Sequence, residues 1–312
     1  MDSGFWAGLL DINYLQVVLN GLFLGSMYAL IALGYSMVYG IIKLLNFAHG
    51  DVFMFGGFLG FTMLIALPGG LHGLGLVATL IVLLIAMLAT GLTGVLIEAL
   101  AYRRLRSAPR LSVLITAVGM SFVLEYGVRQ IWGPNPRPWP AWARMQGDRL
   151  YVGPAVINQA QIILVVIAVV LMVALAGFIN FTRRGRAMRA IALDQRASAL
   201  MGIDVNKTIS LVFFIGSALA GAAGVMFGAY YASIDFLMGF LLGLKAFTAA
   251  VIGGIGNLYG AMLGGLTLGL LESFGTALLG AEWKDVFAFV CLILFLTLKP
   301  TGILGERVVE RM

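Results

Sequence analysis

The chain contains two very long stretches without a formally charged side chain, residues 52–97 and residues 12–42. A helix that crosses a membrane needs ~20 apolar residues, because the hydrocarbon layer is ~30 Å thick. The longer stretch therefore has room for two spans, and Pro68-Gly69-Gly70 divides it, since proline and paired glycines end regular helix. Residues 12–42 are interpreted as one long helix, tilted or broken.

Further apolar segments predict spans over residues 111–128, 162–179, 208–234 and 283–298. Glycines interrupt residues 236–281 every few positions, which indicates two short spans or two half-helices that enter from opposite sides. Only 11% of the residues are charged, against ~25% in a soluble domain, so the composition excludes a soluble enzyme. We expect an all-α polytopic membrane bundle with glycine-broken helices, built as a single domain over residues 1–312 from about eight or nine transmembrane segments.

The positions of the basic residues predict the orientation, because Lys and Arg favour the cytoplasmic loops. Thirteen would lie inside, namely Arg103, Arg104, Arg106, Arg110, Arg183, Arg184, Arg186, Arg189, Arg196, Lys207, Lys299, Arg307 and Arg311. Only five would lie outside, namely Arg129, Arg137, Arg144, Arg149 and Lys284. This asymmetry, with no basic residue before position 14, places the N-terminus outside and the C-terminus in the cytoplasm. The basic residues behind the net charge of +6 are therefore explained by membrane orientation and do not indicate a nucleic-acid partner.

The motifs of common enzyme classes are missing from the sequence. No GxxxxGK[ST] phosphate loop, HExxH, CxxC or GxSxG occurs, and Cys291 is the single cysteine. We therefore expect no catalytic residue, no metal site and no cofactor bound by this chain. The passage of a solute or ion, or assembly as a membrane subunit, remains.

The first informative stretch, KLLNFAHGD at residues 43–51, places three ionisable groups between two apolar spans. It can be an ordinary cytoplasmic turn, because Asn, His and Gly are common turn residues. It can instead be an unwound joint inside the membrane, where irregular backbone survives only against protein or a watery cavity. In the second interpretation Asn46, His49 and Gly50 contribute to a translocation path.

The second stretch, RRGRAMRAIALDQRASALMGIDVNKT at residues 183–208, has apolar residues at helical spacing and predicts a short amphipathic helix that ends near Gly202. It can lie on the inner leaflet with its arginines on anionic lipid, or dock a cytoplasmic partner. Its small apolar residues, without Trp or Phe, favour docking. The candidate docking residues are Arg186, Arg189, Asp194, Ala197, Leu200, Met201 and Gly202.

The third stretch, KAFTAAVIGGIGNLYGAMLGG at residues 245–265, has small residues at the four-residue spacing of close helix packing. The glycines at 253, 254 and 256 exceed that need, since each costs ~1 kcal/mol in a helix interior. We expect a break there, with exposed helix ends near a solute. The residues assigned to the path are Gly253, Gly254, Gly256 and Asn257.

Isolated ionisable residues inside the apolar segments are expected near span ends, where they reach water, because a charge at the bilayer centre costs ~2.5–3.5 kcal/mol. They are Glu98, Glu125, Asp235, Lys245 and Glu272.

The three stretches, in this order, resemble the permease subunits of bacterial branched-chain amino acid ABC importers, the LivH type. NGLFLGSMYALIALGYSMVYGI at residues 20–41, NFAHGD at 46–51, RRGRAMRAIALD at 183–194, MGI at 201–203 and the third stretch carry the resemblance over nearly the whole chain. In this family residues 183–208 would be the cytoplasmic coupling loop. Its EAA-type core is only loosely echoed by Asp194, Ala197 and Gly202.

The resemblance implies a heteromeric importer in the bacterial inner membrane that works by alternating access. This chain would pair with a homologous second permease of the LivM type, two cytoplasmic ATPase subunits would bind ATP and Mg²⁺, and a periplasmic binding protein would deliver Leu, Ile or Val. Related permeases carry urea, short amides or other amino acids. From the residues alone, a stand-alone channel, a secondary carrier and a membrane scaffold stay open.

Overall fold

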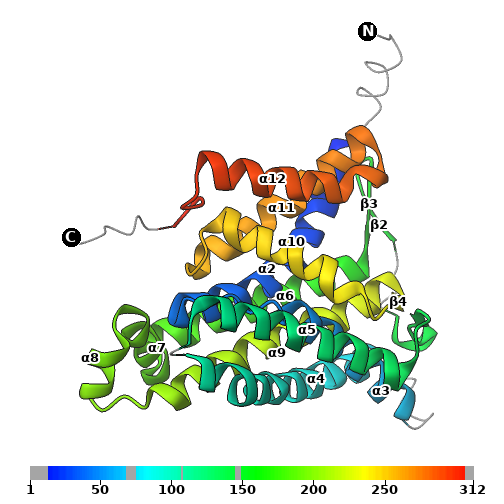
Figure 1. The fold of residues 1–312 in the computed structure, drawn as a ribbon. Coiled ribbons are helices and arrows are strands. Elements are labelled where there is room, and N and C mark those ends of the chain that lie inside the picture. Colours follow the sequence, from blue (N-terminus) through cyan, green and yellow to red (C-terminus); the bar gives the residue numbers. More distant parts are fainter. Residues whose placement is uncertain (1–12, 68–74, 107, 145–148, 306–312) are drawn as a thin grey trace.

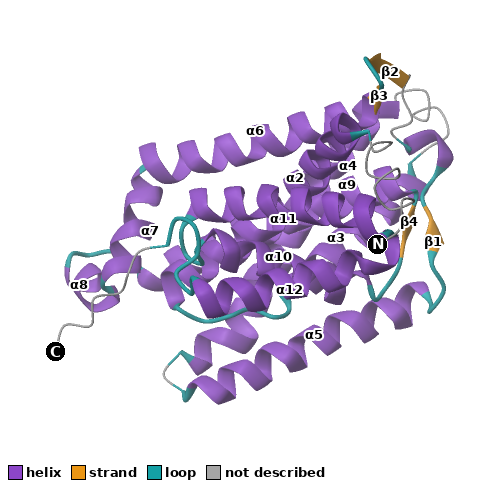
Figure 2. Cartoon of the chain, turned by 90° about the horizontal axis from the view of Figure 1, so that it is seen from above, coloured by secondary structure: helices purple, strands orange, loops and turns teal. Residues whose placement is uncertain are grey.

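The computed structural model describes residues 13–67, 75–106, 108–144 and 149–305. In this part of the chain helices lie side by side and run along one common direction (Figure 1). The short helices α7 (Arg183–Leu193) and α8 (Gln195–Leu200) lie at one end of the bundle, and the strands lie at the other end (Figure 2). We call these the α7–α8 end and the strand end.

Seven helical segments are long and apolar enough to cross a membrane. They are Tyr14–Ile42 (α2), His49–Ala66 (α3), Gly75–Leu105, Leu111–Trp132 in α5 (Arg110–Trp132), Gln159–Phe181 (α6), Val205–Tyr231 (α9) and Leu258–Leu279 (α11). The third consists of α4 (Gly75–Ile97), a π-helical turn over Glu98–Tyr102 and a 3₁₀ turn over Arg103–Leu105. Two shorter helices, α10 (Met238–Gly253) and α12 (Lys284–Leu298), lie beside them, so the expected helical membrane bundle is confirmed.

Polar side chains at helix starts fix several of these boundaries, because the first backbone N–H groups of a helix have no partner within the helix. Asn13 caps α2 by accepting from the backbone N–H of Gln16 at 3.1 Å. Asn158 forms a capping box with Gln161 at the start of α6. Asp204 caps α9.

Helix α2 forms the centre of the bundle and packs against α11, α9, α10 and α6. Its residues from Gly25 to Val38 are buried without interruption. Small residues allow the close approach to α11: a methyl group added at Gly265 would lie 2.5 Å from the backbone of Ala29. Such contacts replace the hydrophobic drive that lipid removes.

Two small antiparallel sheets close the strand end. Strand β1 (Arg137–Pro138) pairs with β4 (Ser233–Ile234), so that Arg137 lies opposite Ile234. Strands β2 (Arg149–Val152) and β3 (Ala155–Asn158) form a hairpin with Arg149 opposite Asn158. Near this hairpin, the Asn13 side chain donates to the Pro154 carbonyl oxygen at 2.6 Å, which fixes the strands to the start of α2.

Most predicted spans agree with the structure to within a few residues, and one span end and one predicted break can be compared in detail. The span predicted to end at 234 ends at Tyr231, because Ala232 adopts a left-handed conformation with φ 58° and β4 follows. The predicted break in 236–281 falls after α10, where Gly254 and Gly256 have φ of 106° and 96°. The other predicted break, at residues 68–70, lies outside the described residues.

Candidate functional site

Residues 183–200 fold into two helices, α7 and α8, which we call the α7–α8 hairpin, and the single amphipathic helix predicted there is wrong. The Thr182 side chain caps α7, and the Asp194 carboxylate caps α8 by accepting from the backbone N–H groups of Arg196 and Ala197 at 2.7 and 3.0 Å. Because the acceptor at Asp194 begins a new helix, the chain turns there. Gly202 follows α8 with φ 82°, a conformation that glycine adopts without strain.

All seven residues that were predicted to dock a partner are exposed. Three apolar side chains at the outer end of the hairpin, which we call its tip, are almost fully exposed: Leu193 is 90%, Leu200 89% and Met201 83% exposed. Met188 and Ile191, which the sequence pattern assigns to the same apolar face, are instead buried against the bundle. The hairpin therefore uses one set of apolar residues for attachment and presents another set outward.

Side chains of the hairpin region tie it to the membrane helices. The Arg189 guanidinium donates to the carbonyl of Ile179 at the end of α6. Gln195 donates to the Ile41 carbonyl oxygen at 3.2 Å, which reaches the end of α2. Beyond the hairpin, the backbone N–H of Lys207 and then its ammonium group hold the pKa of the Asp204 carboxyl below its usual value. Arg189 and Gln195 thus connect the hairpin to the ends of α6 and α2.

The stretch over residues 46–51 lies inside the bundle and not on its surface. Asn46 is buried and its Oδ1 accepts from the Tyr102 hydroxyl at 2.8 Å. The His49 ring meets the Tyr35 ring edge to face, with centroids 4.7 Å apart. Among the described residues, Nε2 of His49 has no hydrogen-bond partner. Gly50 is in backbone contact with Gly239 of α10, so the stretch is a packed joint of α2, α3 and α10.

The glycine-rich stretch forms the turn between α10 and α11. Asn257 caps α11 by accepting from the N–H of Gly260 at 3.0 Å, and its Nδ2 donates to the Leu304 carbonyl oxygen at 2.9 Å. The N–H of Leu304 in turn donates to the Gly253 carbonyl oxygen at 2.9 Å. Gly254 lies against residues 301–305, and Gly256 donates to Ser36 of α2. The exposed helix ends expected here are therefore occupied by the chain's own groups.

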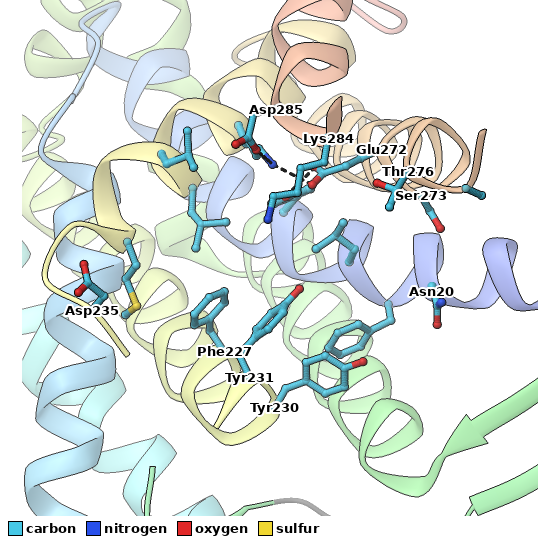
Figure 3. Close-up of a pocket in the computed structure, with 18 of the residues that line it drawn as sticks. Asn20, Phe227, Tyr230, Tyr231, Asp235, Glu272, Ser273, Thr276, Lys284 and Asp285 are labelled. Carbon is cyan, nitrogen blue, oxygen red and sulfur yellow. Dashed lines mark hydrogen bonds and ion pairs between the residues drawn. The ribbon is translucent and has the colours of Figure 1, made fainter. Parts of the chain in front are cut away.

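A cavity of about 780 Å³ lies at the strand end, between α2, α9, α10, α11 and α12 (Figure 3). None of the seven predicted path residues is among the described residues that line it. Gly256 and Arg189 line a smaller cavity of about 90 Å³ beside α7. The phenyl ring of Phe227 and the phenol rings of Tyr230 and Tyr231 lie on one side of the large cavity. Glu272, Lys284 and Asp285 lie across from them, and Asp235 lies to the left of Phe227 in this view.

The charged side of the large cavity is held together by Lys245. Its ammonium group is 2.8 Å from Oε1 of Glu272 and 2.5 Å from Oδ1 of Asp285. The Tyr28 hydroxyl donates to the other oxygen of Glu272 at 2.8 Å. Lys245 and Glu272 are buried, so the expectation that both lie at water-exposed span ends is wrong: mutual pairing satisfies them inside the bundle.

Glu98 lies near the end of its span, in the π-helical turn after α4, as expected, but its side chain is fully buried and does not reach water. It accepts from Arg103 at 2.7 Å, from Arg106, and from the Ser210 hydroxyl at 2.9 Å. Asp235 does lie between elements, after β4 and before α10. Glu125 is buried on α5.

The comparisons with known proteins agree with this architecture. The family described as branched-chain amino acid transport system / permease component matches residues 17–296. The chain is 44% identical to the high-affinity branched-chain amino acid transport system permease protein BraD of Pseudomonas aeruginosa, over 96% of this chain and 98% of that protein. It is 42% identical to the corresponding LivH of Escherichia coli, with the same coverage. No solved structure matches. The chain therefore belongs to the family of permease components of branched-chain amino acid transport systems.

Proposed function

We propose that this chain is the permease subunit of an ATP-driven importer that carries Leu, Ile or Val across the bacterial inner membrane. The observation that carries the proposal is the 42–44% identity, over nearly the full length, to permease proteins of high-affinity branched-chain amino acid transport systems. The sequence has no phosphate loop, so ATP and Mg²⁺ are assigned to two partner ATPase subunits.

The exposed tip of α7 and α8 supports the docking of these ATPases. Leu193, Leu200 and Met201 form an apolar knob beside charged residues, as expected for a helix that enters a groove of a partner. When the ATPases close on ATP, the knob moves, and the contacts of Arg189 and Gln195 pass the motion to α6 and α2. The permease pair then alternates between inward-facing and outward-facing states.

The proposal assigns the remaining partners and the orientation. The α7–α8 end faces the cytoplasm, and a binding protein delivers the amino acid at the strand end. A homologous permease of the LivM type completes the pair. Asn46, His49, Gly50, Gly253, Gly254, Gly256 and Asn257 are assigned to the moving joints of the translocation path, since the joints at 46–51 and 253–257 both contact α2 or its neighbours.

Two substitutions at the tip test the docking. Ala197→Arg and Leu200→Glu place a large or charged group on the exposed surface of α8 and leave the buried contacts of Met188 and Ile191 unchanged. We expect the ATPases to stop co-purifying with the complex, and ATP-dependent leucine uptake into proteoliposomes to fall more than tenfold. Leu150→Glu, at an exposed leucine of the strand end, is the matched control for ATPase co-purification.

The same proteoliposomes separate the alternative functions. Leucine flux that persists without ATP or without ATPase subunits indicates a channel or a secondary carrier. Uptake of urea, a short amide or another amino acid in place of leucine keeps the importer and changes the solute. Unchanged uptake and co-purification in both tip variants contradict docking at α8.

A further inference from the structure

The large cavity at the strand end combines an apolar wall with a cluster of opposite charges. Five charged side chains line it: Asp235, Lys245, Glu272, Lys284 and Asp285. The rest of the lining is mostly apolar or aromatic and includes Phe23, Leu24, Phe227, Leu241 and Leu242. At about 780 Å³ the cavity falls in the ~300–1,000 Å³ range of small-molecule sites. A ligand that fits it has a charged head and an apolar body.

The charges in the cavity favour a head that carries both signs. Three carboxylates and two ammonium groups line it, and Lys245 already pairs with two of the carboxylates. Glu272 and Asp285 therefore share one ammonium group and each is only partly compensated, while Asp235 accepts from the backbone N–H of Leu237. Lys284, in contrast, makes no ion pair with any described residue, so its ammonium group is available to an incoming carboxylate. A zwitterion satisfies both and leaves the net charge of the site unchanged.

Exposure decides which groups a ligand reaches. The side chains of Lys245 and Glu272 are only 2% and 5% exposed, whereas that of Asp285 is 36% exposed. Lys284 is exposed beside Asp285 at the start of α12, and both line the cavity. In Figure 3 the labelled Lys284 and Asp285 lie on the same side of the cavity as Glu272, across from Phe227 and Tyr231. The buried pair thus holds Asp285 in place, and Asp285 and Lys284 face the ligand.

We propose that this cavity binds the free amino acid during transport. The ammonium group of the amino acid binds the carboxylate of Asp285, its carboxylate binds the ammonium group of Lys284, and its branched side chain packs against Phe23, Phe227 and Leu241. The inference rests on the proposed function, because it places the transported amino acid within this permease chain. The cavity lies at the end of the bundle opposite α7 and α8, where a delivered solute enters.

The site can be tested by asking whether L-leucine protects an introduced cysteine from a maleimide, in the full chain in lipid nanodiscs. This measurement detects binding even when the affinity is low. Cys291 is the single cysteine, so Cys291→Ala gives a cysteine-free background. In this background Thr276→Cys places a thiol on the cavity wall, and Ser233→Cys places one at the exposed residue of β4, outside the cavity. We expect L-leucine to slow the reaction of a water-soluble maleimide at position 276 and not at position 233, and glucose to slow neither.

Two charge variants assign the ends of the ligand. Lys284→Gln should raise the L-leucine concentration that gives half protection by about 10- to 100-fold, the value of a charge-assisted hydrogen bond. The same variant should leave protection by leucinamide, which has no carboxylate, unchanged. Asp285→Asn should weaken L-leucine and leucinamide but not 4-methylpentanoate, which has no ammonium group. Lys299→Gln, an exposed lysine just beyond the other end of α12, is the matched control.

The outcomes separate this inference from the proposed function. If the complete importer takes up leucine with ATP but leucine gives no protection at position 276, the site is wrong and the function stands. If the L-leucine concentration for half protection is the same in Lys284→Gln, Asp285→Asn and the parent chain, the assignment of the ligand's charged groups to these two residues is also wrong. If the complete importer takes up no leucine under any condition, the proposed function and this ligand fail together.

Discussion

The crossing of α2 and α11 allows a strict test of the packing argument, because Gly269 and Gly25 touch through their backbones. A methyl group at Gly269 would lie 2.3 Å from the Cα and N atoms of Gly25 and 2.5 Å from the carbonyl oxygen of Gly21. These are backbone atoms, so no side-chain rotation relieves the contact. Since an ordinary van der Waals contact begins near 3.4 Å, the two helices must separate by about 1 Å in Gly269→Ala.

The magnitude follows from two opposing terms. Overpacking a close-packed contact costs ~1–3 kcal/mol, and a backbone-to-backbone clash at the central helix belongs in the upper part of that range. Replacing glycine by alanine in a helix returns up to ~1 kcal/mol. We therefore expect Gly269→Ala to lower the free energy of unfolding by about 1–2 kcal/mol.

Gly119 on α5 provides the matched control, because nothing lies within 4 Å of a methyl group placed there. Gly119→Ala should keep only the helix-propensity gain and stabilise the chain by up to ~1 kcal/mol. Thermal unfolding of both variants in detergent, followed by intrinsic fluorescence, should show melting temperatures about 2–5 °C apart, since a chain of 312 residues shifts by about 1.5 °C per kcal/mol. Equal melting temperatures, or a more stable Gly269→Ala, would refute the view that glycine sets the α2–α11 distance.

Two charged clusters give further predictions. Lys245→Met leaves the buried Glu272 without its ammonium partner and should destabilise the chain by about 3–5 kcal/mol. Lys245→Met with Glu272→Met leaves the part-exposed Asp285 and the Tyr28 hydroxyl without these partners, but no deeply buried charge, and should cost clearly less; thermal melting of both variants measures this, and equal losses would contradict it. Glu98→Gln keeps the shape but removes the charge that Arg106 contacts, and should cost about 1–3 kcal/mol. The exposed Glu282→Gln is its control, and an equal effect of both changes would show that the Glu98 cluster carries no stability.

The helices could be predicted from the sequence because each apolar stretch is separated from the next by a break with a physical cause. The span predicted at residues 12–42 became α2, Tyr14–Ile42, since Asn13 provides a cap at one end. The glycines at 254 and 256 ended α10 as expected, because both adopt positive φ. The same reasoning left open whether residues 43–51 form a surface turn or a joint inside the bundle, since periodicity carries no information on the packing of a loop.

The α7–α8 hairpin shows where local patterns fail. The arginines predicted that this hairpin is exposed. Its division into two helices depends on the Asp194 side chain, which accepts from the backbone N–H groups two and three residues later. The sequence D-Q-R-A at 194–197 already contains this helix-capping pattern. The apolar residues were treated as one face. Only the neighbouring helices decide that Met188 points inward and Leu200 points outward.

The cavity could not be predicted residue by residue, because its charged groups come from separate helices. Lys245 lies on α10, Glu272 on α11 and Asp285 on α12, and each alone is best explained by a place near water. A different rule applies when they are considered together. In a membrane chain an ammonium group and a carboxylate that both fall within apolar segments lower each other's cost by pairing. Lys245 and Glu272 are 27 positions apart in the sequence, which allows an antiparallel helix pair with a turn at 254–257. A glycine break between two apolar segments, with one opposite charge on each segment, therefore predicts that the segments fold back on each other and that the charges pair. The cavity lies where the helix pair of α10 and α11 meets α12.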